Sequence, residues 1–221
     1  MKSLSAKLTL SGLKMVLRAH SFTYQLASYL SHKVEEDALH PKHRIMNYHK
    51  FFVDNVSEND TVLDIGCGNG ALTYDVAKKA KKVVGIDLNE RNIEIARNRF
   101  SLENIEYIHG DAVTSLRDER FDVIILSNVL EHIPKRVEFL ICLKKRASKF
   151  LIRVPMFNRS WIDVYKKELG LEYRLDKTHF IEYTFETFNE EMAKAGLTVL
   201  GYSIQFGEIW TVVMNKKSES D

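Results

Sequence analysis

The sequence predicts an α/β fold in which a mostly parallel sheet ends in an antiparallel pair of strands and helices precede the sheet. Three observations support this prediction. Short apolar segments alternate with helix-forming segments over residues 61–154, as in parallel sheets covered on both faces. The first segment, Thr61–Ile65, runs into a turn with glycines at alternate positions. The last two strand-like segments, 197–206 and 209–214, are joined by a turn too short for a crossover helix, so they are antiparallel.

The expected elements were assigned from hydrophobic periodicity and from turn residues. Their number and order predict a Rossmann-like, seven-stranded sheet. The expected helices after residue 44 are 45–56, 71–80, 90–100, 129–146 and 186–195, and the expected strands are 61–65, 82–87, 105–110, 121–126, 150–154, 197–206 and 209–214.

The composition is that of an ordinary globular domain. Of 221 residues, 45% are hydrophobic and 28% are charged, and the formal net charge of +2 gives no overall signal for nucleic acid binding. Cys67 and Cys142 lack the spacing of a metal site, and their positions argue against a disulfide. A reducing, cytoplasmic location is therefore expected, with a membrane-peripheral or organellar location left open. No apolar run approaches the roughly 20 residues that span a bilayer.

The N-terminal segment, residues 1–34, predicts helix, with a break expected near Arg18–Ser21. It contains no Asp or Glu, although lysines and an arginine are scattered among its leucines. Three interpretations are open: a helix that covers the domain or its substrate cleft, a helix on a membrane surface, and an organelle transit segment. The expected boundaries are 1–44 for this helical extension or lid, 45–216 for the main domain with a substrate-shaping insertion at 156–184, and 217–221 for a disordered tail.

Polar residues stand at the carboxyl ends of the expected strands, where open α/β sheets bind ligands. Asp64 precedes the glycine turn after the first strand, and Asp87 ends the second. Asp87 comes 21 positions after Gly66, which fits a carboxylate that accepts hydrogen bonds from a ribose diol. Asp111 follows the third strand, where an adenine edge is expected, and Asn128 follows the fourth. Aspartates that merely cap helices are the alternative interpretation.

The glycine turn discriminates between nucleotides. Gly66, Gly68 and Gly70 occupy alternate positions, whereas a dinucleotide pyrophosphate is bound by Gly-x-Gly-x-x-Gly. Asp64, just before the turn, would repel a pyrophosphate. A ligand that carries an amino-acid ammonium would tolerate this carboxylate or be attracted to it. Both features disfavour a dinucleotide.

Several motifs resemble, in their order, those of the class I S-adenosylmethionine (SAM) methyltransferases. The run Val129–Pro134 is most similar to the small-molecule branch that includes ubiquinone and menaquinone biosynthesis methyltransferases. The resemblance covers about residues 45–215 and implies SAM as the cofactor. The motifs are Val62–Thr73, Val84–Asp87, His109–Ala112 and Phe121–Pro134.

The resemblance also implies roles for single residues. The three glycines would pack near the methionine moiety. Asp87 would hold the ribose hydroxyls, and Leu88 would lie beside the adenine. Asp111 and Ala112 would meet the adenine edge, while Asn128 would lie between the methionine part and the mouth of the active site.

A tripeptide ahead of the first strand, His43–Ile45, is similar to one in ubiquinone O-methyltransferases. By this resemblance Arg44 would pair with the SAM carboxylate. A plain surface charge is the alternative interpretation.

The acceptor side is less defined by the sequence. Methyl transfer from a sulfonium needs no metal, and none is expected, but the acceptor must be positioned and a hydroxyl must lose its proton. His132 and His179 are the candidate bases; the alternatives are a helix-capping or packing role for His132 and a solvated loop for His179. Residues 156–184 are rich in aromatic and basic side chains, which suit a planar or anionic acceptor and equally suit the packing of a helical lid.

The expected function is therefore SAM-dependent methyl transfer to a small molecule, at oxygen. An NAD-type Rossmann oxidoreductase, an RNA or protein methyltransferase, and a catalytically silent SAM-binding subunit are the alternatives. Nucleic acid is disfavoured as a partner, and peripheral membrane contact through the basic N-terminal helix stays open.

Overall fold

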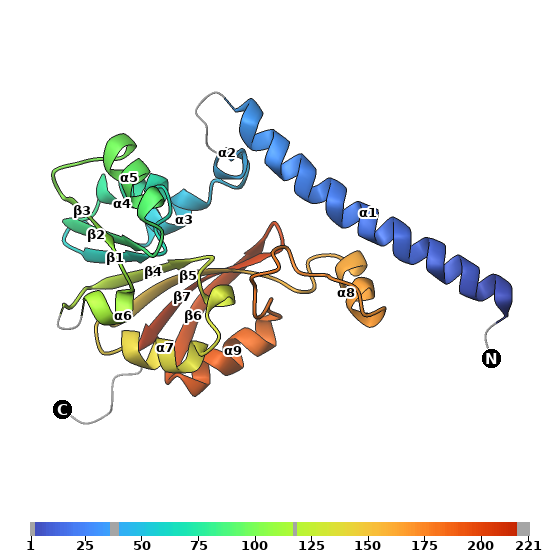
Figure 1. The fold of residues 1–221 in the computed structure, drawn as a ribbon. Coiled ribbons are helices and arrows are strands. Elements are labelled where there is room, and N and C mark those ends of the chain that lie inside the picture. The colour runs from blue at the N-terminus through green and yellow to red at the C-terminus, as the bar shows by residue number, and fades with distance from the viewer. Residues whose placement is uncertain (1–2, 36–39, 117–118, 216–221) are drawn as a thin grey trace.

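The computed structural model describes residues 3–35, 40–116 and 119–215. Its centre is the predicted seven-stranded sheet, with the order β3-β2-β1-β4-β5-β7-β6 (Figure 1). Strands β1 to β5 run parallel, and β7 is antiparallel to both β5 and β6. The strands are β1 (Thr61–Ile65), β2 (Lys82–Asp87), β3 (Ile105–His109), β4 (Val123–Ser127), β5 (Lys149–Pro155), β6 (Leu197–Gln205) and β7 (Glu208–Asn215).

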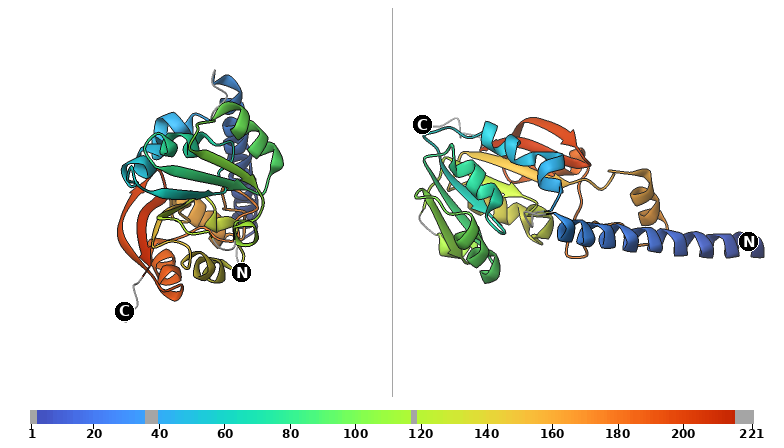
Figure 2. Two further views of the ribbon diagram at one scale, coloured as in Figure 1. Left: turned by 90° about the vertical axis from the view of Figure 1, so that its left-hand side faces the viewer. Right: turned by 90° about the horizontal axis from the view of Figure 1, so that it is seen from above.

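Helices cover both faces of the sheet. Helices α3, α4 and α5 lie on one side and α6, α7 and α9 on the other, as Figures 1 and 2 show. The helices are α1 (Leu4–Val34), α2 (Lys42–Met46), α3 (Tyr48–Asp54), α4 (Ala71–Ala77), α5 (Glu90–Arg99), α6 (Ala112–Ser115), η1 (Leu130–His132), α7 (Arg136–Leu143), α8 (Trp161–Glu168) and α9 (Phe185–Lys194).

Alternate residues of each central strand belong to different hydrophobic cores, because successive side chains of a strand point to opposite faces. In β1, Val62 packs in one core with Phe52 of α3 and Val76 of α4. Its neighbour Leu63 packs in the other core, which contains Leu140 of α7. The strand order reverses between β1 and β4, so the carboxyl ends of these strands flank the place where ligands bind in such sheets.

Helix α1 differs from its predicted form, because it runs from Leu4 to Val34 without the break expected near Arg18–Ser21. That stretch contains neither glycine nor proline, and the Ser21 hydroxyl donates within the helix to the Leu17 carbonyl. The helix projects from the sheet domain, with α8 beside it (Figures 1 and 2). Among the described residues, no helix combines the length and the apolar character needed to cross a membrane.

Two other predicted helices are interrupted for local reasons. The predicted helix 129–146 is split into η1 and α7, because Pro134 lacks an N–H and restricts the residue before it. The predicted helix 45–56 is split by Asn47, whose φ of 47° lies in the left-handed region that asparagine tolerates. The predicted tail, 217–221, lies outside the described residues.

Candidate functional site

The glycine turn after β1 is held by close neighbours. Gly66, Gly68 and Gly70 all have positive φ angles, of 68°, 55° and 85°. A Cβ at Gly66 would lie 2.8 Å from the Val129 side chain, and one at Gly70 would lie 2.6 Å from the Tyr107 hydroxyl. A Cβ at Gly68 would meet nothing within 4 Å among the described residues. Gly68 therefore presents bare backbone to open space, where a ligand can approach it.

Asp87 joins the end of β2 to this turn. Its Oδ2 accepts a hydrogen bond from the Gly68 N–H at 2.9 Å, and its Oδ1 accepts one from the Asn89 N–H at 2.8 Å. Asn92 also donates to Oδ1, at 3.3 Å. A carboxylate offers about four acceptor positions, so these three bonds leave capacity for a ligand hydroxyl. The next residue, Leu88, is 72% exposed and flanks this position.

A cavity of about 200 Å³ lies over the glycine turn, with Gly66 and Gly68 in its lining. Asp64 lines it as well, and the Asp64 Oδ2 accepts a 2.6 Å hydrogen bond from the Thr73 hydroxyl. Burial raises the pKa of Asp64 to about 7, although the Thr73 hydrogen bond acts in the opposite direction. An ammonium group in this cavity would favour the ionised form of Asp64.

Arg153 supplies a buried cation to the same cavity, a role that was not among the predictions from the sequence. Its Nε donates to Asn128 Oδ1 at 2.9 Å and lies 3.5 Å from a carboxylate oxygen of Glu208. Its guanidinium lies over the Tyr48 ring, 3.6 Å from the centroid. The available signal was a charged residue inside the otherwise apolar segment 150–154.

Asn128, the residue that follows β4, lines a second cavity. Ser127 lines the first cavity and Asn128 lines the second. Asn128 has a φ of 56°, a left-handed conformation that asparagine adopts more readily than most residues. Its N–H donates to the Arg153 carbonyl at 2.8 Å, so backbone and side chain both fix its orientation.

The second cavity has a volume of about 430 Å³ and lies between α1 and the carboxyl end of the sheet. Tyr24 and Tyr29 of α1 contribute aromatic side chains, and Lys42 contributes a cation. Residues from 175 to 179, within the predicted insertion 156–184, form part of its lining. Helix α1 and this insertion therefore both border the cavity.

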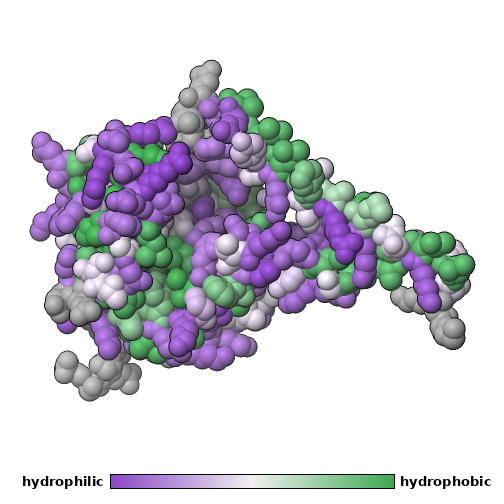
Figure 3. Space-filling model, viewed as in Figure 1, coloured by the Kyte–Doolittle hydropathy of each residue, from purple (hydrophilic) through white to green (hydrophobic). Residues whose placement is uncertain are grey.

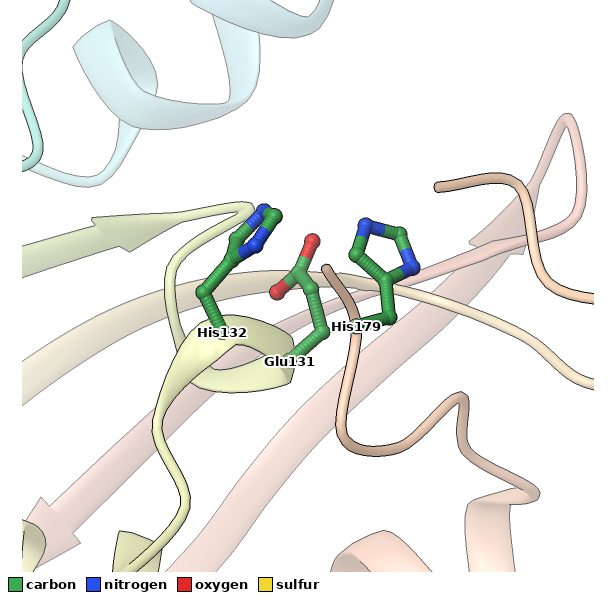
Figure 4. Close-up of side chains that lie close together, drawn as sticks. All are labelled: Glu131, His132 and His179. Carbon is green, nitrogen blue, oxygen red and sulfur yellow. The ribbon is translucent and has the colours of Figure 1, made fainter. Parts of the chain in front are cut away.

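Glu131, His132 and His179 gather in the second cavity, with the Glu131 carboxylate between the two imidazoles (Figure 4). The ring centroids of His132 and His179 are 4.7 Å apart. Burial raises the pKa of Glu131 to about 8, while burial and the neighbouring His179 lower the pKa of His132. Both histidines were predicted, but Glu131 was not, because its burial depends on how η1 packs.

The sequence and the fold both match known methyltransferases. Residues 63–147 match the profile of a family described as methyltransferase domain. The mitochondrial ubiquinone biosynthesis O-methyltransferase of Schizosaccharomyces pombe is 34% identical over 97 residues, which are 42% of this chain and 35% of that protein. A Pyrococcus abyssi protein named "Probable ribosomal RNA small subunit methyltransferase A" is 52% identical over 61 residues, 28% of this chain and 23% of that protein. The chain spans less than half of the length of these curated relatives.

A solved structure shows the same fold. The N-methyltransferase NodS of Bradyrhizobium japonicum, in complex with S-adenosyl-L-homocysteine, superposes with a TM-score of 0.59 at 17% identity. The match covers 80% of this chain and 87% of that one. Residues 63–147 therefore carry a methyltransferase domain, and the fold is that of SAM-dependent methyltransferases. SAM is the cofactor of this family, so the dinucleotide alternative is not supported.

The methyltransferase domain brings most of the predicted cofactor residues to one edge of the sheet. Asp111 acts as the N-cap of α6, because its Oδ1 accepts hydrogen bonds from the N–H groups of Val113 and Thr114. Ala112 is buried behind it. Capping and contact with the adenine edge are compatible, so the predicted adenine role of Asp111 stays a prediction.

Arg44 is not among the residues that line the cavity over the glycine turn. It forms an ion pair of 3.0 Å with Glu35, and its side chain is 70% exposed. This geometry corresponds to the surface-charge interpretation. The pairing of Arg44 with the SAM carboxylate stays a prediction, and Arg153 is the better placed cation.

Proposed function

We propose that this chain is a SAM-dependent methyltransferase whose acceptor is a small molecule, bound in the cavity between α1 and the sheet and methylated at oxygen. One observation carries the proposal: consecutive residues, Ser127 and Asn128, line the cofactor cavity and the larger cavity, respectively. A methyl group carried by the cofactor would therefore lie next to the acceptor at this point. Displacement at a methyl carbon requires this kind of alignment of the two reactants.

The size and lining of the larger cavity support a small acceptor. A volume of about 430 Å³ lies in the range of small-molecule sites. Tyr24 and Tyr29 offer faces for a planar ring, while His132 and His179 can accept a proton from a hydroxyl. The lowered pKa of His132 keeps its imidazole neutral near pH 7, as a proton acceptor requires.

The proposal includes a second role for helix α1. This helix would lie against an anionic membrane surface while it closes the acceptor cavity. Its described residues include Lys7, Lys14 and Arg18 but no acidic side chain. Exposed apolar side chains run along it, and Figure 3 shows them on the projecting helix as well. Such a combination favours an acidic lipid surface.

A turnover assay with SAM labelled in the methyl group tests the acceptor class. Phenols, catechols, quinols and small-subunit ribosomal RNA would be offered in parallel to the wild-type chain. We expect label in at least one small hydroxylated compound and none in RNA. The variants His132→Ala and His179→Ala should lower kcat without changing SAM affinity. Label transfer to RNA alone would contradict the proposal.

A further inference from the structure

Glu131 is an exceptional carboxylate for a protein interior. It is 0% exposed, and neither of its carboxylate oxygens has a hydrogen-bond partner among the described residues. A buried polar group without a partner destabilises a fold, and an ionised one does so strongly. A cation in the adjoining cavity would be a suitable partner for this buried carboxylate.

His179 is oriented toward this carboxylate by a buried acidic neighbour. The His179 Nδ1 lies 3.0 Å from Oε1 of Glu182, which is also paired with Arg159. An ionised carboxylate only accepts hydrogen bonds, so Nδ1 carries the proton. The lone pair of the neutral His179 ring is consequently on Nε2.

His132 is fixed in the same tautomer by a different route. The Thr178 hydroxyl donates its single proton to Asp176 Oδ1 at 2.8 Å. The Oγ1 atom of Thr178 also lies 3.0 Å from His132 Nδ1. Because the hydroxyl has already donated its proton, it must accept a hydrogen bond from that nitrogen. The lone pair of the neutral His132 ring is therefore also on Nε2. Imidazoles that bind metals are held in this manner, with the second nitrogen donating to a carboxylate or another acceptor.

We propose that Glu131, His132 and His179 bind a divalent transition-metal ion of the Zn²⁺ type. One ligand atom from each residue lies within 4.8 Å of the others. Bonds of about 2.0–2.2 Å to a shared ion would draw these atoms closer together. Two imidazoles and a carboxylate are a common ligand set for Zn²⁺ and Fe²⁺, and three protein ligands leave a position open to the cavity.

The metal would define the acceptor class, and this consequence rests on the function proposed above. A hydroxyl of the acceptor would occupy the open position, where a bound cation lowers its pKa. Its proton passes to water, and the oxygen then forms a bond to the methyl carbon as the carbon–sulfur bond breaks, with the electron pair staying on sulfur. When the metal is bound, both imidazole Nε2 lone pairs are used for it, so water takes over the role of proton acceptor that the two rings have in the metal-free form of the function proposed above.

The test is titration of the metal-free chain with Co²⁺, without SAM or acceptor, followed by visible absorption and then by displacement with Zn²⁺. We expect one tight site in the wild type. Glu131→Gln and His132→Ala should weaken Co²⁺ binding by at least about 100-fold, because even the residues behind such ligands contribute about 10–100-fold. Glu186→Gln, which alters an exposed carboxylate on α9, is the matched control and should bind Co²⁺ like the wild type.

Circular dichroism of each variant shows whether it is folded. His132 is exposed, so His132→Ala remains informative if Glu131→Gln fails to fold. Equal Co²⁺ affinity of wild type and His132→Ala, or no Co²⁺ site in the wild type, would overturn the metal site. The proposed function is judged separately, because methyl transfer by a chain treated with a chelator would support it without the metal.

Discussion

Asp64 is a buried carboxylate that lines the cavity over the glycine turn, where a cofactor with an ammonium group is expected. Its pKa of about 7 lies above the ordinary value of 3.8 because burial disfavours the charged form. An adjacent ammonium favours the charged form and would lower this pKa. SAM binding should therefore release a proton from Asp64 at pH values below about 7.

We predict that SAM affinity falls as pH falls through 7. At pH 6 about nine-tenths of Asp64 would be protonated, so binding should be about tenfold weaker than at pH 8. Calorimetry at several pH values, in buffers of different ionisation enthalpy, measures both the affinity and the released proton. Asp64→Asn should remove the pH dependence. A wild-type affinity that is the same at pH 6 and pH 8 would contradict this role.

Arg153 and Arg44 are the two candidate partners of the SAM carboxylate. A charged hydrogen bond contributes about 1.5–3 kcal/mol, which corresponds to about 10–100-fold in affinity. We expect Arg153→Gln to weaken SAM binding by this amount and Arg44→Gln to change it less than about twofold. Fluorescence or calorimetric titration of both variants measures the difference. The reverse order would favour the pairing that the sequence resemblance implies.

Among the elements, α1 is the one whose surface is least explained by the fold. Leu17 is its buried residue among those described, whereas Leu8, Met15 and Phe22 recur every seven residues and are exposed. Residues seven apart lie near one face of a helix, so these side chains form an apolar stripe. Basic side chains accompany the stripe, which fits an anionic lipid surface.

We predict that the chain binds vesicles containing phosphatidylserine and that Met15→Glu weakens this binding by about 10–100-fold. Burial of an apolar side chain of this size contributes about 1.5–3 kcal/mol. Met15 is 69% exposed in the structure, so the substitution should leave the fold intact. Vesicle flotation or sedimentation measures the bound fraction.

The matched control is Leu200→Glu, at a residue of β6 that is 65% exposed. It should bind vesicles like the wild type. Loss of binding in both variants would indicate a general charge effect. Absence of vesicle binding in the wild type would contradict the membrane proposal. Analytical ultracentrifugation would then show whether the chain dimerises, as expected if a second copy covers α1.

The regular elements could be predicted from the sequence because their signals are local. Apolar strands, glycine turns and strand-end aspartates such as Asp87 depend on periodicity and on chain order. Arg153 could not be assigned in this way, because its environment depends on the register that pairs it with Ser127 across β4 and β5. Glu131 could not be predicted for the same reason. Its burial, and the lack of a hydrogen-bond partner for its carboxylate oxygens among the described residues, arise only when η1 packs against the segment that contains His179.

The breaks in the predicted helices show a second limit of local patterns. A break was predicted near Arg18–Ser21 in the N-terminal helix, yet the helix continues because nothing there blocks its backbone hydrogen bonds. Pro134 does block them, and the predicted helix 129–146 is divided at that point. The chemistry of the backbone therefore decides where these helices are interrupted.

At the scale of the whole molecule, the small cavity over the glycine turn and the larger cavity are lined by consecutive residues, Ser127 and Asn128, respectively. Asn128 and Arg153 join them by a direct hydrogen bond, and Glu208 in the larger cavity pairs with Arg153 in the smaller one. A ligand bound in one cavity should therefore change the ligand affinity of the other cavity through these buried charges.

The most direct test of this account is calorimetric titration of the wild type and of Asp87→Ala with SAM, with NAD as the second ligand. We expect the wild type to bind SAM and not NAD. We also expect Asp87→Ala to bind SAM at least about tenfold more weakly, because the ribose hydroxyls lose a charged acceptor. Binding of NAD without SAM, or an unchanged SAM affinity in Asp87→Ala, would contradict it.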